Sequence, residues 1–251
     1  MIRSIKILHS HGIQYIRDLR KAELTPLFRG RPVLTGNPST EEAEALARIC
    51  PSDAIRTAPF GIDLGRCVFC RECEFAAPER IRFTNDHRLA VNSRDRLIIQ
   101  SGDNGPITID PELVRPEIRR LFGRSLKLRQ VSAGGDNSCE MELNAAGNVN
   151  FDMGRYGIEF VASPRHADGL VITGPVTANM AEALRICYDA TPDPKIIILC
   201  GTDAISGGLF DGSTAIDRSF IDIYPVDLYV PGNPVHPLTF ILGILDLLGR
   251  K

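Results

Sequence analysis

Three of the seven cysteines form the run Cys67-x2-Cys70-x2-Cys73, and this run constrains the fold more than any other feature of the sequence. Three thiolates at this spacing in one tight loop can bind three irons of a cubane [4Fe–4S] cluster, which then requires a fourth thiolate. The surrounding residues 51–95 consist of short elements separated by turns, with little room for a hydrophobic core. The sequence therefore predicts a small loop-rich unit that a bound inorganic group helps to hold together.

The fourth thiolate is expected from a distant position. In bacterial two-cluster ferredoxins the run continues to a fourth cysteine followed by proline, and that cysteine binds the other cluster. Here the run continues to Ala77-Pro78, whereas Cys50-Pro51 has the form of the end of a first run. The upstream positions that would complete this first run are Thr40, Ala43 and Leu46, none of which can bind iron.

The missing ligands all belong to one cluster. The set that is lost as a whole is Thr40, Ala43, Leu46 and Ala77. The set that is complete is Cys50, Cys67, Cys70 and Cys73. We therefore expect one [4Fe–4S] cluster, with its iron bound by the four thiolates of the complete set. A zinc site made by the same thiolates, and four free cysteines, are the alternatives.

Charge and hydropathy exclude several functional classes. The 251 residues carry 29 Lys and Arg against 31 Asp and Glu, a formal net charge of −2, so no overall field attracts nucleic acid. No stretch approaches the roughly 18–20 uncharged residues that span a bilayer, and the first residues lack the apolar segment of a secretory signal. We expect a cytoplasmic chain that reaches a membrane only through partner subunits.

The N-terminal half is predicted to begin with a lead-in segment, residues 1–28, that contains a short helix followed by turns. Residues 39–50 give a clear helical signal, because Ser39 can cap the first turn and Glu42 can complete a capping box. This helix brings Cys50 to its C-terminal end. Residues 96–122 include a stretch of turn residues and are expected to connect two structural units.

The C-terminal part, residues 123–251, alternates short apolar strands with helices. The predicted strands are residues 126–131, 157–162, 169–173, 195–200 and 227–230. The predicted helices between them include residues 139–144 and 177–190. Strands that alternate with helices favour an α/β fold with a parallel sheet covered on both faces, in which ligands lie beyond the carboxyl ends of the strands.

Around the cysteine run the chain resembles the ferredoxin-type subunits of complex I and of membrane-bound energy-converting hydrogenases. The matching segments are Phe28-Arg-Gly-Arg-Pro32, Cys50-Pro-Ser-Asp-Ala-Ile55 and Asp63-Leu-Gly-Arg-Cys-Val-Phe-Cys70. The resemblance covers about residues 28–95. It implies a small α+β ferredoxin-like domain, residues 29–95, that carries the single cluster.

The C-terminal part resembles the small subunit of energy-converting nickel–iron hydrogenases, which is equivalent to the complex I subunit that carries its terminal cluster. The matching segments are His166-Ala-Asp-Gly-Leu-Val-Ile-Thr-Gly-Pro-Val-Thr177, Pro194-Lys195, Ala204-Ile-Ser-Gly-Gly-Leu-Phe210 and Pro225-Val-Asp-Leu-Tyr-Val-Pro-Gly232. The resemblance spans about residues 124–250 and implies a flavodoxin-like fold. It also implies a place for a proximal [4Fe–4S] cluster, which four cysteines bind in this family.

Three of these four proximal-cluster positions lack a thiolate in this chain. Carried over by the resemblance, the positions are Asp136, Cys139, Asp203 and Asn233. Carboxylate and amide oxygens are poor ligands for a sulfur-bridged iron cluster, so no cluster is expected here. One alternative is a single metal ion, with the ligands Asp136, Cys139, Asp203 and His236. The other alternative is a polar pocket without a metal, whose side chains hydrogen-bond to one another or to water.

If the fold is preserved, the side chains at these four positions should still converge. Two carboxylates in one pocket would repel each other and raise the pKa of at least one of them, unless Asn233 or His236 compensates the charge. Two further cysteines, Cys187 and Cys200, are expected to be small buried side chains.

These observations predict an electron-transfer subunit of a membrane-associated hydrogenase-like or NADH:quinone-oxidoreductase-like complex. The resemblance implies a docked large-subunit homologue, a ferredoxin or another electron carrier as electron partner, and a place at the cytoplasmic face of the membrane. No catalytic residue and no substrate site are predicted. The alternative is an assembly subunit without a redox role, in which the cluster only stabilises its own domain.

Overall fold

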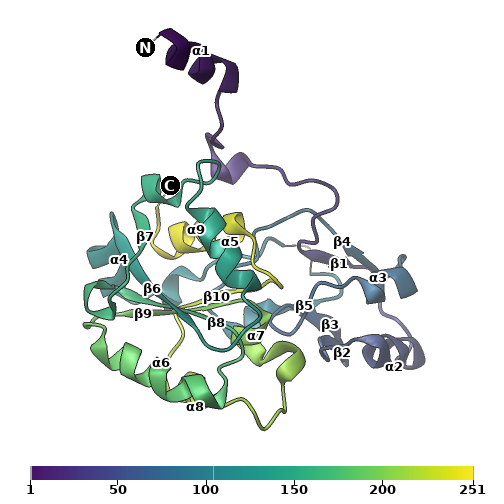
Figure 1. Cartoon of the computed structure of the whole chain (residues 1–251). Helices are drawn as coiled ribbons and strands as arrows, with labels where there is room; N and C mark the ends of the chain where they lie inside the picture. Colours follow the sequence, from purple (N-terminus) through teal and green to yellow (C-terminus); the bar gives the residue numbers. More distant parts are fainter. Residues whose placement is uncertain (1, 104, 251) are drawn as a thin grey trace.

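The computed structural model describes residues 2–103 and 105–250 (Figure 1). Met1, Asn104 and Lys251 fall in the expected lead-in, connector and C-terminal part and lie outside the described residues. A parallel sheet lies between two layers of helices, and two smaller antiparallel sheets pack beside it. Helix α1 (Ile2–His11) projects away from the rest of the chain.

The larger sheet has five strands, and all of them pair in parallel. These are β6 (Leu126–Ser132), β7 (Ile158–Phe160), β8 (Gly169–Thr173), β9 (Ile196–Cys200) and β10 (Leu228–Val230). Their spatial order is β7-β6-β8-β9-β10, which is the order 2-1-3-4-5 of a flavodoxin-like sheet. Every residue of β8 and β9 is buried, as central strands covered on both faces must be. The predicted α/β, flavodoxin-like fold class is therefore confirmed.

Six helices in the described residues accompany this sheet. They are α4 (Pro116–Phe122), α5 (Ser138–Ala146), α6 (Ala178–Ala190), α7 (Thr202–Ser206), α8 (Ser219–Ile223) and α9 (Pro237–Leu247). Figure 1 shows α5 and α9 on one face of the sheet and α6 and α8 on the other. Successive strand residues point to opposite faces, so Val171 belongs to the core with α9, whereas Leu170 and Ile172 belong to the core with α6. Every residue of α9 except Asp246 is buried.

The smaller sheets are built from the N-terminal half of the chain. Strand β1 (Pro32–Leu34) pairs with β4 (Ile81–Phe83), and β3 (Phe60–Asp63) pairs with both β2 (Ile55–Thr57) and β5 (Ile98–Gln100), all antiparallel. Two helices complete this part, α2 (Thr40–Ile49) and α3 (Glu72–Ala76). Strand β5 lies in the stretch expected as a connector, so the sheet that it joins extends beyond residue 95.

Helix α2 forms where the sequence predicts it. The Ser39 side chain accepts from the backbone N–H of Glu42, and the Glu42 carboxylate accepts from the backbone N–H of Ser39, which is a complete capping box. The apolar side of the helix is anchored by Ala43 and Leu46, both buried. The helix ends at Cys50, which is its C-terminal cap.

The two halves of the chain share one core. Buried residues of the small sheets, such as Ile62 and Ile81, pack in the same hydrophobic core as Leu199 of β9. The backbones of Val91 and Tyr229 exchange two hydrogen bonds of 3.0 and 2.7 Å, so Val91 extends the edge of the parallel sheet beside β10. The small sheets are therefore fixed firmly beside the carboxyl ends of the parallel strands.

Short 3-10 turns link several of these elements. They lie at Leu19–Lys21, Arg94–Leu97, Pro111–Leu113, Met153–Tyr156, Pro164–His166 and Gly208–Phe210. Within residues 2–103 and 105–250, none of the helices has both the length and the apolar character needed to cross a bilayer.

Candidate functional site

Four thiols from two distant segments line one cavity, which we call the cysteine cavity. Its cysteines are Cys50, Cys67, Cys70 and Cys73. Cys50 follows α2, Cys67 and Cys70 lie in the loop before α3, and Cys73 lies within α3. Apolar residues, including Ile62 of β3 and Phe83 of β4, form the rest of its wall. The structure thus brings together the complete ligand set that the spacing predicted.

The backbone around the cysteine cavity points donors at sulfur. The N–H of Ala54 donates to Sγ of Cys50 at 3.2 Å, and the N–H of Phe69 donates to Sγ of Cys67 at 3.3 Å. The loop turns tightly, because Phe69 and Arg71 adopt left-handed backbone angles with φ of 54° and 71°. The guanidinium of Arg29 donates to the carbonyl of Phe69 at 2.9 Å and so supports the loop from the side.

Burial disfavours the ionised form of two of these thiols. It raises the pKa of Cys67 far above the usual value, and it raises the pKa of Cys73 to about 12. Neighbouring thiolates add to both shifts, since like charges in one cavity repel. Four thiolates could coexist here only with a positively charged group between them, because a bound metal deprotonates its thiol ligands.

The four sulfurs do not surround a single-ion site. In the described part of the chain, no three or more His, Cys, Asp and Glu side chains lie close enough together to hold a metal ion. The geometry therefore shows a cavity lined by four thiols, with donors aimed at two of them, and not a preformed mononuclear metal site.

A second cavity, which we call the carboxylate cavity, lies at the carboxyl ends of the parallel strands. It contains all four of the side chains carried over from the proximal-cluster positions, Asp136, Cys139, Asp203 and Asn233. Asp136 follows β6, Asp203 follows β9 in α7, and Asn233 follows β10. Parallel strands end at the same edge of a sheet, which explains why positions so distant in sequence converge.

The two carboxylates have opposite electrostatic environments. Asp136 accepts hydrogen bonds from the backbone N–H and the hydroxyl of Ser138, at 2.9 and 2.6 Å, and these bonds lower its pKa. Burial raises the pKa of Asp203, and the charge of Asp136 raises it further. The expected rise in the pKa of one carboxyl group falls on Asp203, with burial as its main cause and repulsion by Asp136 as the second.

The compensating residue is Ser138, which the sequence analysis missed. The signal was present, because an Asp followed two residues later by Ser at the start of a helix commonly forms this kind of turn. The hydroxyl of Ser138 satisfies Asp136 without a cation. No such donor is found for Asp203 among the described residues, and its carboxylate packs against Gly208 so closely that a Cβ on Gly208 would lie 2.0 Å from its Oδ1.

His236 lies elsewhere, and the expectations attached to it are wrong. It is the N-terminal cap of α9, where its Nδ1 accepts from the backbone N–H of Leu238 at 3.2 Å. Its ring packs edge-on against Phe28 and Phe151, and burial lowers its pKa to about 4. It is absent from the lining of the carboxylate cavity, so it neither compensates the carboxylates nor completes a metal site with them.

Cys139 is the one proximal-cluster position that has a thiol, and this thiol hydrogen-bonds with another cysteine of the carboxylate cavity. Cys200, at the end of β9, is fully buried as predicted, and its hydrogen bond lowers the pKa of Cys139. A Cβ on Gly201 would lie 2.6 Å from Sγ of Cys139, so only glycine fits there. The other cysteine expected to be buried, Cys187, is only half-buried on α6.

Thr202 joins the two cavities, and the sequence analysis did not single it out. It is 1% exposed, and its hydroxyl donates to the carbonyl of Cys67 at 2.8 Å. Its backbone N–H donates to the carbonyl of Gly232 at 3.0 Å. A single residue at the start of α7 thereby ties the cysteine loop to both loops that carry Asp203 and Asn233.

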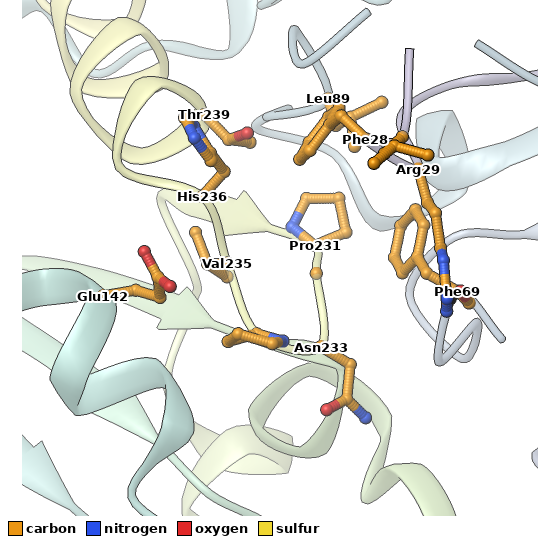
Figure 2. A pocket seen from close by; sticks show the side chains of 13 residues that line it. Phe28, Arg29, Phe69, Leu89, Glu142, Pro231, Asn233, Val235, His236 and Thr239 are labelled. Carbon is orange, nitrogen blue, oxygen red and sulfur yellow. Dashed lines mark hydrogen bonds between the residues drawn. The ribbon is translucent and has the colours of Figure 1, made fainter. Parts of the chain in front are cut away.

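A larger and mainly apolar cavity of about 330 Å³ lies beside this junction. Figure 2 shows Phe69 of the cysteine loop on one side and the loop from Pro231 to His236 on the other. Asn233 lines both this cavity and the carboxylate cavity. Burial raises the pKa of Glu142, which also belongs to its wall.

Comparison with known proteins shows that the C-terminal part of the chain matches a known family. Residues 137–247 match the family described as NADH ubiquinone oxidoreductase, 20 kDa subunit. A probable membrane-bound hydrogenase subunit of Pyrococcus furiosus is 38% identical over 134 residues, which cover 53% of this chain and 80% of that protein. The matched family residues exclude the four cysteines of the cysteine cavity and include most of the carboxylate cavity.

Two further relatives have more residues outside the similarity. Formate hydrogenlyase subunit 7 of Escherichia coli is 37% identical over 146 residues, which cover 57% of each protein. A subunit of the NADH-quinone oxidoreductase of Bacteroides thetaiotaomicron is 41% identical over 127 residues, which cover 50% of this chain and 64% of that protein. All three similarities leave about half of this chain unmatched.

Proposed function

The chain belongs to the family of the 20 kDa subunit of NADH ubiquinone oxidoreductase, and we propose that it is an electron-transfer subunit of a membrane-associated hydrogenase-like or NADH:quinone-oxidoreductase-like complex. Its relatives are subunits of hydrogenases and of NADH-quinone oxidoreductase, which supports membership in an oxidoreductase complex. The single observation that carries the electron-transfer role is the cysteine cavity, in which four thiols from two segments meet.

The proposed cofactor is one [4Fe–4S] cluster bound by Cys50, Cys67, Cys70 and Cys73. Such a cluster, when bound, supplies single-electron chemistry at a potential set by its surroundings. The residues of this chain suit it, because soft thiolates are the preferred ligands and backbone N–H groups already point at Sγ of Cys50 and Cys67. The zinc alternative uses the same four thiolates, so the presence of iron and sulfide in the purified chain distinguishes the two.

The rest of the chain positions this centre and excludes water from it. Cys67 and Cys73 are buried, and Ile62 and Phe83 close the cavity from the side of the small sheets. Thr202 fixes the cysteine loop against the parallel sheet through the carbonyl of Cys67. An electron carrier needs this kind of fixed, dry surrounding, because solvent exposure and hydrogen bonds to sulfur set the potential of such a centre.

We further propose that the edge containing the carboxylate cavity docks a large-subunit homologue. The proposed docking surface lies on the loops 201–208 and 231–237, and the residues of these loops that are not buried are Asp203, Ser206, Asn233, Pro234 and His236. Leu209 and Phe210, which directly follow the first of these loops, are 57% and 47% exposed. Large exposed apolar side chains beside a polar cavity are typical of a surface that a partner covers. A ferredoxin or a similar carrier is the proposed electron partner of the cysteine cavity.

The test is electron transfer into the full chain, purified without oxygen. Reduced ferredoxin should bleach its visible absorption rapidly, and re-oxidation should restore it. Cys70→Ser should abolish this response, whereas Cys187→Ser removes a thiol outside both cavities and should leave it unchanged. If iron and sulfide are present but neither reduced ferredoxin nor another low-potential carrier changes the absorption, the electron-transfer role is wrong and the cluster serves only to stabilise its domain.

A further inference from the structure

Helix α1 (Ile2–His11) has no partner within the described part of the chain. Figure 1 shows it held away from the body by a short linker, and residues 3–15 are all exposed. The chain first joins the body at Tyr15 and Ile16, where the guanidinium of Arg155 lies over the Tyr15 ring and the N–H of Ile16 donates to the carbonyl of Asn150 at 2.9 Å. The helix is therefore free to meet another surface.

An isolated helix of this length needs such a surface to be stable. Helices shorter than roughly 12–15 residues are marginal in water, because nucleation is unfavourable and few hydrogen bonds offset it. The apolar side chains of Ile5 and Leu8, three positions apart on one face, are 59% and 70% exposed. Ile13 in the linker is also 59% exposed. These side chains would be buried if the helix lay against an apolar phase.

The charges of this segment define the chemistry of the surface that fits it. Residues 2–17 contain the basic residues Arg3, Lys6 and Arg17 and no acidic residue, although the whole chain has a net charge of −2. A basic amphipathic helix of this kind is attracted to anionic lipid and buries its apolar face at the boundary between headgroups and acyl chains. The exposed large aliphatic side chains of this segment are Ile5, Ile7, Leu8 and Ile13. They offer too little area for a stable protein interface, since such an interface usually buries at least about 1,000 Å².

We propose that α1 lies in the surface of an anionic membrane, with Ile5 and Leu8 in the lipid and Arg3 and Lys6 at the headgroups. The chain would then contribute its own membrane contact in addition to the contacts of its partners. This inference goes beyond the proposed electron transfer and does not depend on it, because α1 shares no residue with either cavity.

The experiment is sedimentation of the full chain with lipid vesicles. One set of vesicles is phosphatidylcholine alone, and the other is an equimolar mixture of phosphatidylcholine and phosphatidylglycerol. We expect binding to the anionic vesicles that weakens as salt is added, with little binding to the neutral ones. The double variant Ile5→Ser with Leu8→Ser should bind at least about tenfold more weakly, since the burial of both apolar side chains is lost. Arg3→Glu with Lys6→Glu should reduce binding to the anionic vesicles alone.

Ile186→Ser is the matched control, because Ile186 is a similarly exposed apolar side chain, at 61%, on the distant helix α6. It should bind vesicles as the unaltered chain does. The proposal is overturned if the unaltered chain binds neither vesicle, if the α1 variants bind as well as it does, or if the α1 variants disturb only the assembly with partner subunits. Loss of the iron centre in Cys70→Ser should leave vesicle binding intact, so this result stands apart from the test of electron transfer.

Discussion

The cysteine cavity and the carboxylate cavity are assembled in similar ways, but they differ in how their ionisable side chains are stabilised. Each collects its side chains from separate segments, and the two meet at Thr202. In the cysteine cavity, burial and mutual repulsion raise the pKa of Cys67 and Cys73, so the thiolates need a cation. In the carboxylate cavity, Ser138 already satisfies Asp136. The thiols of the cysteine cavity therefore stay protonated unless a cation is bound between them, whereas the carboxylate cavity already contains a donor for one of its two carboxylates.

A third region contains the other set of positions at which a two-cluster ferredoxin would bind iron and this chain has no cysteine. The positions that would hold the other cluster of a two-cluster ferredoxin are Thr40, Ala43, Leu46 and Ala77. Ala43, Leu46 and Ala77 are all buried in the hydrophobic core, and Leu46 and Ala77 also line a cavity of about 230 Å³. The carboxylate cavity instead has polar side chains at the edge of the sheet. We attribute that polarity to its position beside the proposed docking surface, where a fully apolar replacement would expose more hydrophobic area.

The largest difference between the cavities should appear on ligand substitution. Cys50→Ser should lower the bound iron as severely as Cys70→Ser, because both thiols line the cysteine cavity although they lie 20 positions apart. Asp136→Ala and Asp203→Ala should leave the iron content and the electron paramagnetic resonance signal unchanged. Iron analysis and spectroscopy of the four variants check this. If Cys50→Ser kept its iron, or if Asp203→Ala lost iron, the assignment of the iron centre to the cysteine cavity would be contradicted.

A smaller effect is expected at the residue that joins the cavities. Thr202→Val leaves the buried carbonyl of Cys67 without its donor, which should cost about 1–3 kcal/mol in the free energy of unfolding. It should also alter the spectrum of the iron centre, because the cysteine loop loses its support. The measurements are denaturant unfolding and electron paramagnetic resonance.

Thr191→Val provides the control for this prediction. The Thr191 hydroxyl is also buried and donates to the carbonyl of Cys187 at 2.9 Å, and Thr191 lines neither cavity. It should lose comparable stability with an unchanged spectrum. If Thr202→Val leaves the spectrum as unchanged as Thr191→Val does, Thr202 has no positioning role.

The smallest effects concern the two carboxylates, and their signs differ. The pKa of Asp203 is raised in the folded chain, so its ionisation opposes folding increasingly as the pH rises from the ordinary carboxyl value through the folded pKa. Asp203→Asn should therefore stabilise the chain at neutral pH, and this gain should vanish in acid. The pKa of Asp136 is lowered, so its ionisation supports folding and this support is lost as the pH falls through the folded pKa.

Asp136→Asn should accordingly destabilise the chain at neutral pH and less so in acid. The measurement is the thermal midpoint of both variants and of the unaltered chain between neutral and acidic pH. If the thermal midpoint of Asp203→Asn at neutral pH were lower than that of the unaltered chain, the Asp203 carboxylate would have to be stabilised by a donor or a cation other than the contacts described above.

The arrangement of the parallel sheet could be predicted from sequence because its signals are local. Strand β8 matches the prediction at both ends, since the apolar run 169–173 is bounded by polar residues and a turn. Helix α9 was not predicted, although it is the most buried of the described helices, because it is apolar on all sides and has no amphipathic period. Strand β5 was not predicted either, because it pairs with the distant β3, which no local pattern indicates.

The members of the candidate site could be predicted from spacing, but their supporting contacts could not. The cysteine spacing and the family resemblance gave the residues of both cavities. Ser138 had a recognisable local pattern next to Asp136 that was not used. Thr202 had none, because its role depends on a contact with Cys67 across 135 positions of sequence. The sequence predicted His236 beside the carboxylates, but its imidazole ring instead caps the N-terminus of α9.

The most direct test of the account is the iron and acid-labile sulfide content of the full chain purified without oxygen. One filled cysteine cavity and a carboxylate cavity without a cluster predict about four iron and four sulfide per chain. A value near eight of each would place a second cluster in the carboxylate cavity. Zinc without sulfide, or neither metal nor sulfide, would contradict the central claim that the four thiols hold an electron-transferring centre.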